Sequence, residues 1–313
     1  VAAADLTSDI DVSPFDNTAM DGFAVVSSSL ESASEEVPVE LEIVDWVGAG
    51  IVSQVTLAPG QAIRIMTGGI MPEGADAVVK IEDTTFTGDG GVGERVRICA
   101  PVTKTNVRKA GEEAKAGDVV VRAGEVIRAA TVGLLASTGN TVIPVYARPK
   151  VGVISIGTEL VKPPAKPEPG KIRDANAYVL GAYALEMGCE VELYPIVEDD
   201  EAAIRSLFER AIAECDFVVS SGGASNGDFD YAIETVRELG EVVFDCVSLK
   251  PGKAQAFGCV EDTLVEVLSG NPAAAAVGFQ LFGRPALRAI QGFRELDRPV
   301  SEAVLAQPTR KKE

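Results

Sequence analysis

A glycine-rich acidic segment, residues 220–231, has the residue types needed to bind a phosphorylated ligand. It reads Ser-Ser-Gly-Gly-Ala-Ser-Asn-Gly-Asp-Phe-Asp-Tyr. Gly222 and Gly223 would let backbone N–H groups approach an anion closely, and the hydroxyls of Ser220 and Ser221 supply further donors. A tight turn between a strand and a helix would give the same pattern without a ligand, and this alternative stays open.

Two carboxylates near the end of this segment could bind a metal ion. Asp228 and Asp230 flank a single residue, and carboxylate oxygens with substrate phosphates are the ligands that Mg²⁺ prefers. Asp230 would otherwise serve only as the N-cap of a following helix. The sequence contains no histidine, so proton transfer and metal binding must rely on Asp, Glu, Lys or backbone groups. We expect Asp230 to be the principal metal-binding or catalytic carboxylate.

Four more groups of polar residues follow predicted strands or begin predicted helices. They are Gly157-Thr158-Glu159, residues 170–176 with Asp174, Lys250-Pro251-Gly252-Lys253, and Gly270-Asn271-Pro272. The two lysines could neutralise phosphate as point charges. Asn271 fits a helix N-cap with Pro272 as the first helical residue. Solvated loop charges, caps and a surface hairpin are the competing interpretations, so only convergence of these loops would favour a binding site.

From residue 151 onward, apolar runs alternate with amphipathic segments. We expect strands at 151–156, 191–197, 217–220, 242–244 and 263–268, and helices at 175–187, 201–214, 231–239 and from about 272. This alternation predicts a parallel sheet covered by helices on both faces, a three-layer Rossmann-like domain. Ligands of such sheets bind at the carboxyl ends of the strands, where these loops would meet.

The chain up to about residue 147 is predicted to be β-rich. Short Val/Ile runs separated by Gly, Pro and Asp predict strands at 37–44, 63–66, 77–81, 96–98 and 119–121. Residues 88–93 predict a hairpin tip, and residues 128–137 a helix that ends near Gly139. The predicted fold class is therefore an α/β multidomain protein.

The composition limits the partners and the compartment. A net charge of −19 argues against nucleic acid and against an anionic membrane surface, since both need a basic face. No run approaches the 18 or so apolar residues of a membrane helix. Five scattered cysteines without a Cys-x-x-Cys pair indicate reduced thiols, so we expect a cytoplasmic protein.

These motifs, together with others in the first half, resemble the molybdopterin molybdenumtransferase (MoeA) family, which includes the E domain of gephyrin. The additional motifs are residues 15–25 (Phe-Asp-Asn-Thr-Ala-Met-Asp-Gly-Phe-Ala-Val), residues 64–69 (Arg-Ile-Met-Thr-Gly-Gly), residues 72–79 and Gly111-Glu112-Glu113. The resemblance extends from about Asp11 to Gly292. It implies insertion of molybdate into adenylylated molybdopterin, in a Mg²⁺-dependent step that releases AMP.

The resemblance also implies a homodimer whose active sites are shared between subunits. Asp21, Thr67 and Glu113 would face the site from the partner subunit. From the α/β side, the resemblance implies Glu159, Asp174, Asp230, Lys250 and Lys253 as lining residues. Glu159 and Asp174 would support Asp230 or bind amino groups of the pterin. The adenylyltransferase of the same pathway is a further expected partner.

The domains implied by this resemblance divide the chain into four parts. Residues 1–25 and 120–147 would form a mixed linking and dimerisation segment, residues 26–119 a β-rich domain, and residues 148–292 the α/β molybdopterin-binding domain. Residues 293–313 would begin a C-terminal β-barrel, so we expect the chain to be truncated at both ends.

Several positions differ from the family pattern. Ala254 and Ser269 stand where the family has prolines, Asn226 replaces a hydrophobic residue, and Asp228 replaces Glu. Loss of the prolines makes both turns less rigid, which leaves open the rate of turnover and the choice between molybdate and tungstate. The alternatives are therefore a molybdopterin adenylyltransferase, a pterin-binding paralogue without turnover, and a non-catalytic scaffold.

Overall fold

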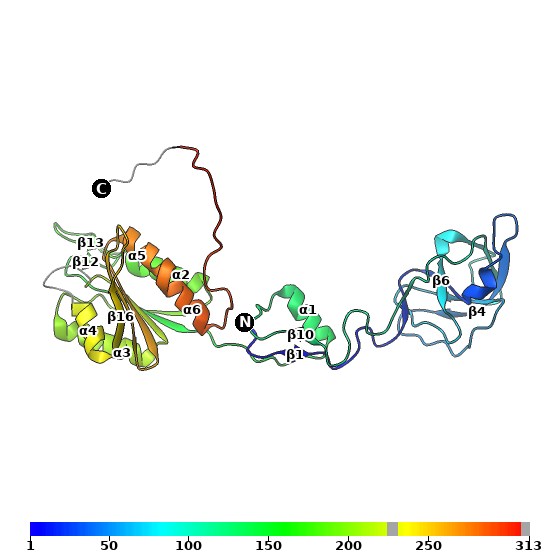
Figure 1. The fold of residues 1–313 in the computed structure, drawn as a ribbon, viewed down its shortest axis with the longest axis horizontal. Helices are drawn as coiled ribbons and strands as arrows, with labels where there is room; N and C mark the ends of the chain where they lie inside the picture. The colour runs from blue at the N-terminus through cyan, green and yellow to red at the C-terminus, as the bar shows by residue number, and fades with distance from the viewer. Residues whose placement is uncertain (224–230, 308–313) are drawn as a thin grey trace. The chain divides into compact units, whose positions relative to one another are not determined.

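The chain forms two compact units, seen here in a computed structural model that describes residues 1–223 and 231–307. The α/β unit comprises Val1–Ala4, Ala123–Val126 and Pro144–Glu313, and the β-rich unit comprises Asp5–Arg122 and Ile127–Ile143 (Figure 1). Each unit has its own hydrophobic cores. The predicted combination of an α/β domain with a β-rich part is confirmed.

The α/β unit is built on a six-stranded sheet with the order β14-β11-β15-β18-β17-β16. The strands are β11 (Lys150–Ser155), β14 (Glu190–Leu193), β15 (Phe217–Ser221), β16 (Glu241–Cys246), β17 (Ala254–Val260) and β18 (Thr263–Leu268). The four strands β14, β11, β15 and β18 are parallel. β17 and β16 pair antiparallel, so the prediction of an all-parallel sheet is wrong at this edge. Only Glu261 and Asp262 separate β17 from β18, and a connection this short permits only an antiparallel hairpin.

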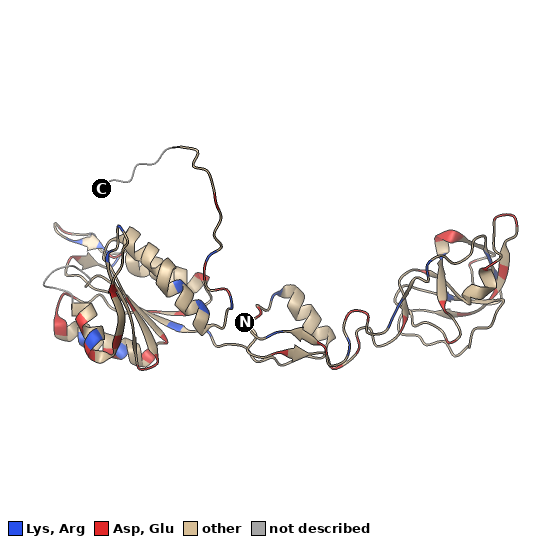
Figure 2. Ribbon diagram, in the orientation of Figure 1, with Lys and Arg blue, Asp and Glu red and all other residues tan. Residues whose placement is uncertain are grey.

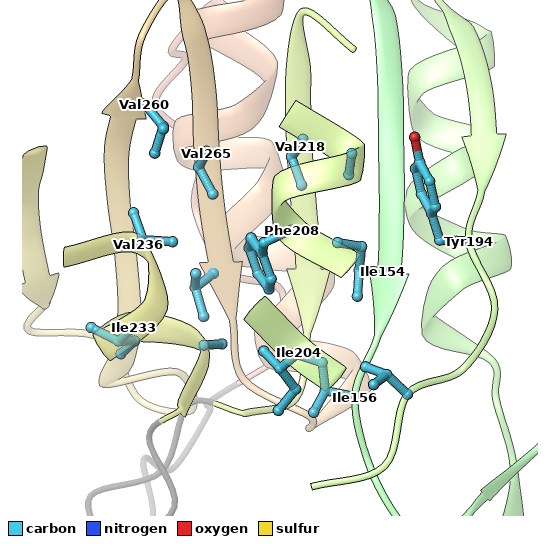
Figure 3. Close-up of a cluster of buried hydrophobic side chains, with 14 of the residues drawn as sticks. Ile154, Ile156, Tyr194, Ile204, Phe208, Val218, Ile233, Val236, Val260 and Val265 are labelled. Atoms are coloured by element: carbon cyan, nitrogen blue, oxygen red, sulfur yellow. The ribbon is translucent and has the colours of Figure 1, made fainter. Parts of the chain in front are cut away.

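Helices cover both faces of this sheet, as predicted. They are α2 (Asn176–Glu186), α3 (Glu201–Glu214), α4 (Tyr231–Leu239), α5 (Pro272–Gly278), the π-helix η3 (Phe279–Gly283) and α6 (Arg284–Ile290). Side chains alternate between the two faces along β11. Ile154 packs with Ile204 and Phe208 of α3 and with α4 (Figure 3). Val153 packs instead with α2, α5, η3 and α6.

The loop edge of the α/β unit also carries a small parallel pair, β12 (Leu160–Val161) and β13 (Ile172–Arg173). The expected strand at 191–197 is shorter, because regular pairing stops at Leu193 and only Val197 pairs again, with Ile156. No helix among residues 1–223 and 231–307 is both long enough and apolar enough to cross a membrane.

A second six-stranded sheet, with the order β6-β3-β5-β4-β8-β7, forms the centre of the β-rich unit. Its strands are β3 (Gly22–Val25), β4 (Val39–Val47), β5 (Gln61–Ile65), β6 (Ala77–Lys80), β7 (Thr84–Phe86) and β8 (Arg95–Ile98), and two short 3₁₀ helices, Ser27–Leu30 and Ile81–Asp83, accompany them. β7 and β8 form the predicted hairpin around residues 88–93. Two clusters of buried side chains fill this unit.

Short elements complete the β-rich unit. β2 (Asn17–Thr18) pairs with β9 (Val107–Arg108), and β1 (Leu6–Thr7) pairs with β10 (Val119–Val121). The helix α1 (Ala129–Ser137) was predicted almost to the residue. It ends two residues before Gly139, whose φ of 78° is the left-handed conformation expected after a helix.

Candidate active site in the α/β unit

The carboxyl ends of β11, β15 and β18 lie side by side and carry two glycine turns. Ser155 pairs with Ser221, and Ser221 pairs with Leu268. The N–H of Gly222 donates to the carbonyl of Leu268 at 3.0 Å. A Cβ on Gly222 would lie 2.0 Å from the carbonyl oxygen of Ile156, and its φ is +93°. Only glycine fits this close approach, so the turn after β15 depends on it.

A cavity of about 280 Å³ opens at this edge. Predicted site residues that line it are Glu159, Asp174, Ser221, Gly222, Gly223, Gly270 and Pro272. Residues from four separate loops are therefore brought together, which is the convergence that the sequence predicted. Ser155, Asn176 and Asp199 also line this cavity, and they were not predicted as site residues.

Asn176, the first residue of α2, links the two glycine turns. Its side-chain amide donates to Ser221 Oγ at 2.7 Å and to the carbonyl of Gly270 at 2.9 Å. One oxygen of Asp174, which is only 6% exposed, accepts from the N–H of Ala177 at 3.1 Å. Asp174 therefore holds the first turn of α2, as the capping interpretation proposed, and also lines the cavity.

Ser155 provides a buried hydroxyl with unused hydrogen-bonding capacity. It is 2% exposed, and its Oγ has no hydrogen-bond partner within the described residues. Buried hydroxyls are normally partnered, so a ligand in the cavity is the natural partner for this one. Its sequence signal was weak, because Ser155 lies inside the apolar run 151–156.

Asp199 stabilises the loop that follows β11. Its carboxylate accepts from the N–H of Thr158 at 3.0 Å and from Thr158 Oγ1 at 2.9 Å. Lys171 donates to the carbonyl of the same threonine at 2.6 Å. The N–H, the hydroxyl and the carbonyl of Thr158 are thus all hydrogen-bonded, which fixes the backbone next to Glu159. The sequence could not single out Asp199, since it is one of three consecutive acidic residues before α3.

Ser220 does not line the cavity. It lies in β15, is fully buried, and its Oγ has no partner within the described residues. Because side chains alternate along a strand, Ser220 points to the face covered by α3 and α4 while Ser221 points to the cavity. Asp228 and Asp230, the predicted metal ligands, lie outside the described residues.

The Lys-Pro-Gly-Lys turn connects β16 to β17 beside the start of α5. A Cβ on Gly252 would lie 3.2 Å from the Cβ of Ala274 in α5. Lys250 and Lys253 are exposed and do not line the cavity. Asn271 is the N-cap of α5, since its Oδ1 accepts from the N–H of Ala274 at 3.1 Å, and the capping prediction is confirmed.

The remaining predicted site residues belong to the β-rich unit. Asp21 Oδ1 accepts from the N–H and from the hydroxyl of Thr67, both at 2.7 Å. These hydrogen bonds, led by the one from the hydroxyl, lower the pKa of Asp21. Glu113 lines a separate hollow of about 330 Å³, together with Arg108 and Lys109.

Known proteins of one family are similar to this chain along nearly its whole length. Residues 1–139 match the MoeA N-terminal region (domain I and II), and residues 152–289 match a probable molybdopterin binding domain. The molybdopterin molybdenumtransferase of Bacillus subtilis is 39% identical over 91% of this chain and 67% of its own length. That of Staphylococcus epidermidis is 35% identical over 98% of this chain and 73% of its own.

A solved structure shows the same similarity. The molybdopterin biosynthesis MoeA protein of Pyrococcus horikoshii OT3 superimposes with a TM-score of 0.80 at 32% identity, covering 95% of this chain and 72% of that one. Sequence motifs, fold and relatives agree. The chain belongs to the molybdopterin molybdenumtransferase family.

Proposed function

We propose that this transferase of molybdenum cofactor biosynthesis inserts molybdate into adenylylated molybdopterin in a Mg²⁺-dependent step that releases AMP. The cavity at the strand ends supports the proposal, because a phosphoanhydride needs closely approaching donors. Ser155 supplies a hydroxyl there that has no partner among the described residues, and the turns at Gly222 and Gly270 expose backbone on two sides. The family relationship supports a molybdopterin substrate.

Phosphate and pterin would contact different residues of this cavity. We assign phosphate oxygens to the glycine turn and to the first turn of α5, where the helix dipole favours an anion. In the glycine turn the N–H of Gly222 already donates to Leu268, so Gly223 would supply the donor. Lys250 and Lys253 would neutralise the developing charge from the adjoining turn. Glu159 and Asp174 line the cavity as acceptors suited to the amino groups of a pterin.

We assign the magnesium ion to Asp228 and Asp230. Within residues 1–223 and 231–307, no group of three or more Asp, Glu or Cys residues is placed to hold a metal. The donor set still suits Mg²⁺, since this ion commonly takes one or two protein carboxylates, substrate phosphates and water. When bound, it would neutralise phosphate oxygens. Asp230 would be the principal carboxylate at the reacting phosphate.

A homodimer with a shared site is part of the proposal. The helix α1 reads Ala-Ala-Thr-Val-Gly-Leu-Leu-Ala-Ser, and only Leu135 of it is buried. Val132 is 56% and Leu134 is 37% exposed. A helix that is apolar on all sides is typically covered, and a second copy of the chain would cover it. The partner's Asp21, Thr67 and Glu113 would then complete each site.

The test is AMP release from adenylylated molybdopterin in the presence of Mg²⁺ and molybdate. We expect the protein to release AMP and Asp230→Asn to abolish release. Binding of the pterin, followed by its fluorescence, should persist in that variant. Release of pyrophosphate from ATP instead would favour an adenylyltransferase, and pterin binding without AMP release would favour a paralogue without turnover.

The proposal also includes a cellular location and an upstream enzyme. All five cysteines are free thiols, which supports the proposed cytoplasmic location. The substrate must come from an enzyme that adenylylates molybdopterin, so that adenylyltransferase is the proposed upstream partner.

A further inference from the structure

Three arginines surround a small hollow at the end of α6, away from the candidate active site. The hollow has a volume of about 310 Å³. The lining residues used below are Glu186, Arg284, Arg288, Gln291, Phe293 and Arg298. Figure 2 shows basic residues on α6. The first residue of α2 lines the active-site cavity and its last lines this hollow, so its eleven residues separate the two by roughly 16 Å.

Each guanidinium is held by a neutral oxygen. Arg284 Nη1 donates to the carbonyl of Leu296 at 2.8 Å, and Arg288 Nε donates to the carbonyl of Glu295 at 2.7 Å. Arg298 Nη2 donates to Gln280 Oε1 at 2.7 Å. A guanidinium has five N–H donors, so these bonds orient the groups and leave most of their donors unused.

Neighbouring side chains add rigidity to the hollow. The guanidinium of Arg288 lies over the ring of Phe293, 4.0 Å from its centroid. Gln291 is buried, and its amide donates to the carbonyl of Leu287 at 3.1 Å. The guanidinium groups are therefore held in place by uncharged neighbours, and their side chains would lose little rotational freedom when a ligand binds.

The three arginines of this hollow form no ion pair with a carboxylate of the described residues. Glu186 lines the hollow but lies beyond ion-pair distance of all three. Burial, followed by Arg288 and Arg298, lowers the pKa of Arg284, and Asp297 opposes this. The chain has 47 acidic and 28 basic residues, so three arginines without an ion pair among the described residues are unusual.

We propose that this hollow binds a phosphate group, either as inorganic phosphate or as part of a nucleotide. Guanidinium forks match pairs of phosphate oxygens in geometry and charge. Such an anion would satisfy the unused donors and offset the mutual repulsion of the three arginines. The hollow is separate from the candidate active site, so its ligand would not take part in the proposed reaction.

Calorimetric titration with inorganic phosphate, AMP and adenosine at constant ionic strength tests the proposal. We expect phosphate and AMP to bind, and adenosine not to. Arg288→Gln should weaken phosphate binding about tenfold or more, and Arg298→Gln, at an exposed position, should act in the same direction. The control is Arg205→Gln, which removes the same charge from α3, where Arg205 pairs with Glu209 and Glu238.

Mapping by mass spectrometry separates this site from the catalytic cavity, which should also bind phosphate. Phosphate should protect Arg284 and Arg288, but not Arg205, from modification by phenylglyoxal. AMP release should be unchanged by Arg288→Gln. The proposal is overturned if phosphate and AMP protect neither arginine, or if Arg205→Gln weakens binding as much as Arg288→Gln does.

Discussion

Glu266 should make the stability of the α/β unit fall as pH rises, and Glu266→Gln should remove most of this dependence. The residue lies in β18 and is 1% exposed, and neither carboxylate oxygen has a hydrogen-bond partner within the described residues. A Cβ on Gly283, the last residue of the π-helix η3, would lie 2.4 Å from Glu266 Oε2. Burial raises the pKa of Glu266 to about 8, and the nearby backbone N–H of Gly283, which lies outside hydrogen-bonding geometry, offsets this only in part.

The direction and size of the effect follow from proton binding. Below pH 4.5 both the folded and the unfolded chain carry the proton, and between 4.5 and about 8 only the folded chain keeps it. The unfolded state therefore binds fewer protons in this window, so each unit of pH costs about 1.4 kcal/mol of unfolding free energy. The interval from 4.5 to about 8 is about 3.5 units, which gives an upper bound of roughly 5 kcal/mol.

Urea denaturation at a mildly acidic and a mildly basic pH measures the difference. Far-UV circular dichroism follows the helices of the α/β unit, while Trp46, the single tryptophan, reports on the β-rich unit. We expect the wild-type midpoint to fall at the higher pH in the helical signal only. Glu190→Gln, at an exposed position on β14, makes the same substitution at a solvated carboxyl and should leave this fall unchanged. An equal fall in Glu266→Gln and wild type would refute the reasoning.

Two more predictions concern the active site and the dimer. Ser155→Ala should raise KM for the adenylylated pterin about tenfold or more, by loss of one hydrogen bond to a charged phosphate oxygen. It should leave Tm unchanged, because this hydroxyl has no partner in the described protein. A lower Tm with unchanged KM would assign Ser155 a structural role only. Val132→Glu should weaken a dimer formed through α1 at least about tenfold, measured by sedimentation. The control Val142→Glu, at a 90% exposed position outside the helix, should not weaken it. A wild-type monomer would contradict the shared site.

Local sequence patterns predicted the elements that depend on local periodicity. The helix Glu201–Glu214 has apolar residues at helical spacing, and its predicted bounds were correct. β11 is a continuous apolar run because both of its faces are covered. β17 was missed, since its sequence Ala-Gln-Ala-Phe-Gly-Cys-Val has no clear alternation. The turn before β18 also lacks the usual Asn-Gly or Asp-Gly signal.

Site residues could be predicted from the sequence where the residue type alone determines the role. They could not be predicted where the role depends on strand pairing. Gly222 is required by its backbone conformation, which its sequence context indicated. Ser220 and Ser221 could not be distinguished until the end of β15 was known, because one position along a strand reverses the face. Asp199 reaches Thr158 only through folding of a segment 41 residues away. Such non-local contacts leave no pattern in a single sequence.

The two-residue turn between β17 and β18 offers a practical attachment point. Glu261 and Asp262 are exposed, and because β17 runs against β18, the turn lies at the edge of the sheet opposite the glycine turns. Exposed turn tips tolerate inserted residues better than other positions. A fluorophore or short peptide grafted there would move with the sheet and stay clear of the candidate site, so ligand binding in the cavity could be followed optically.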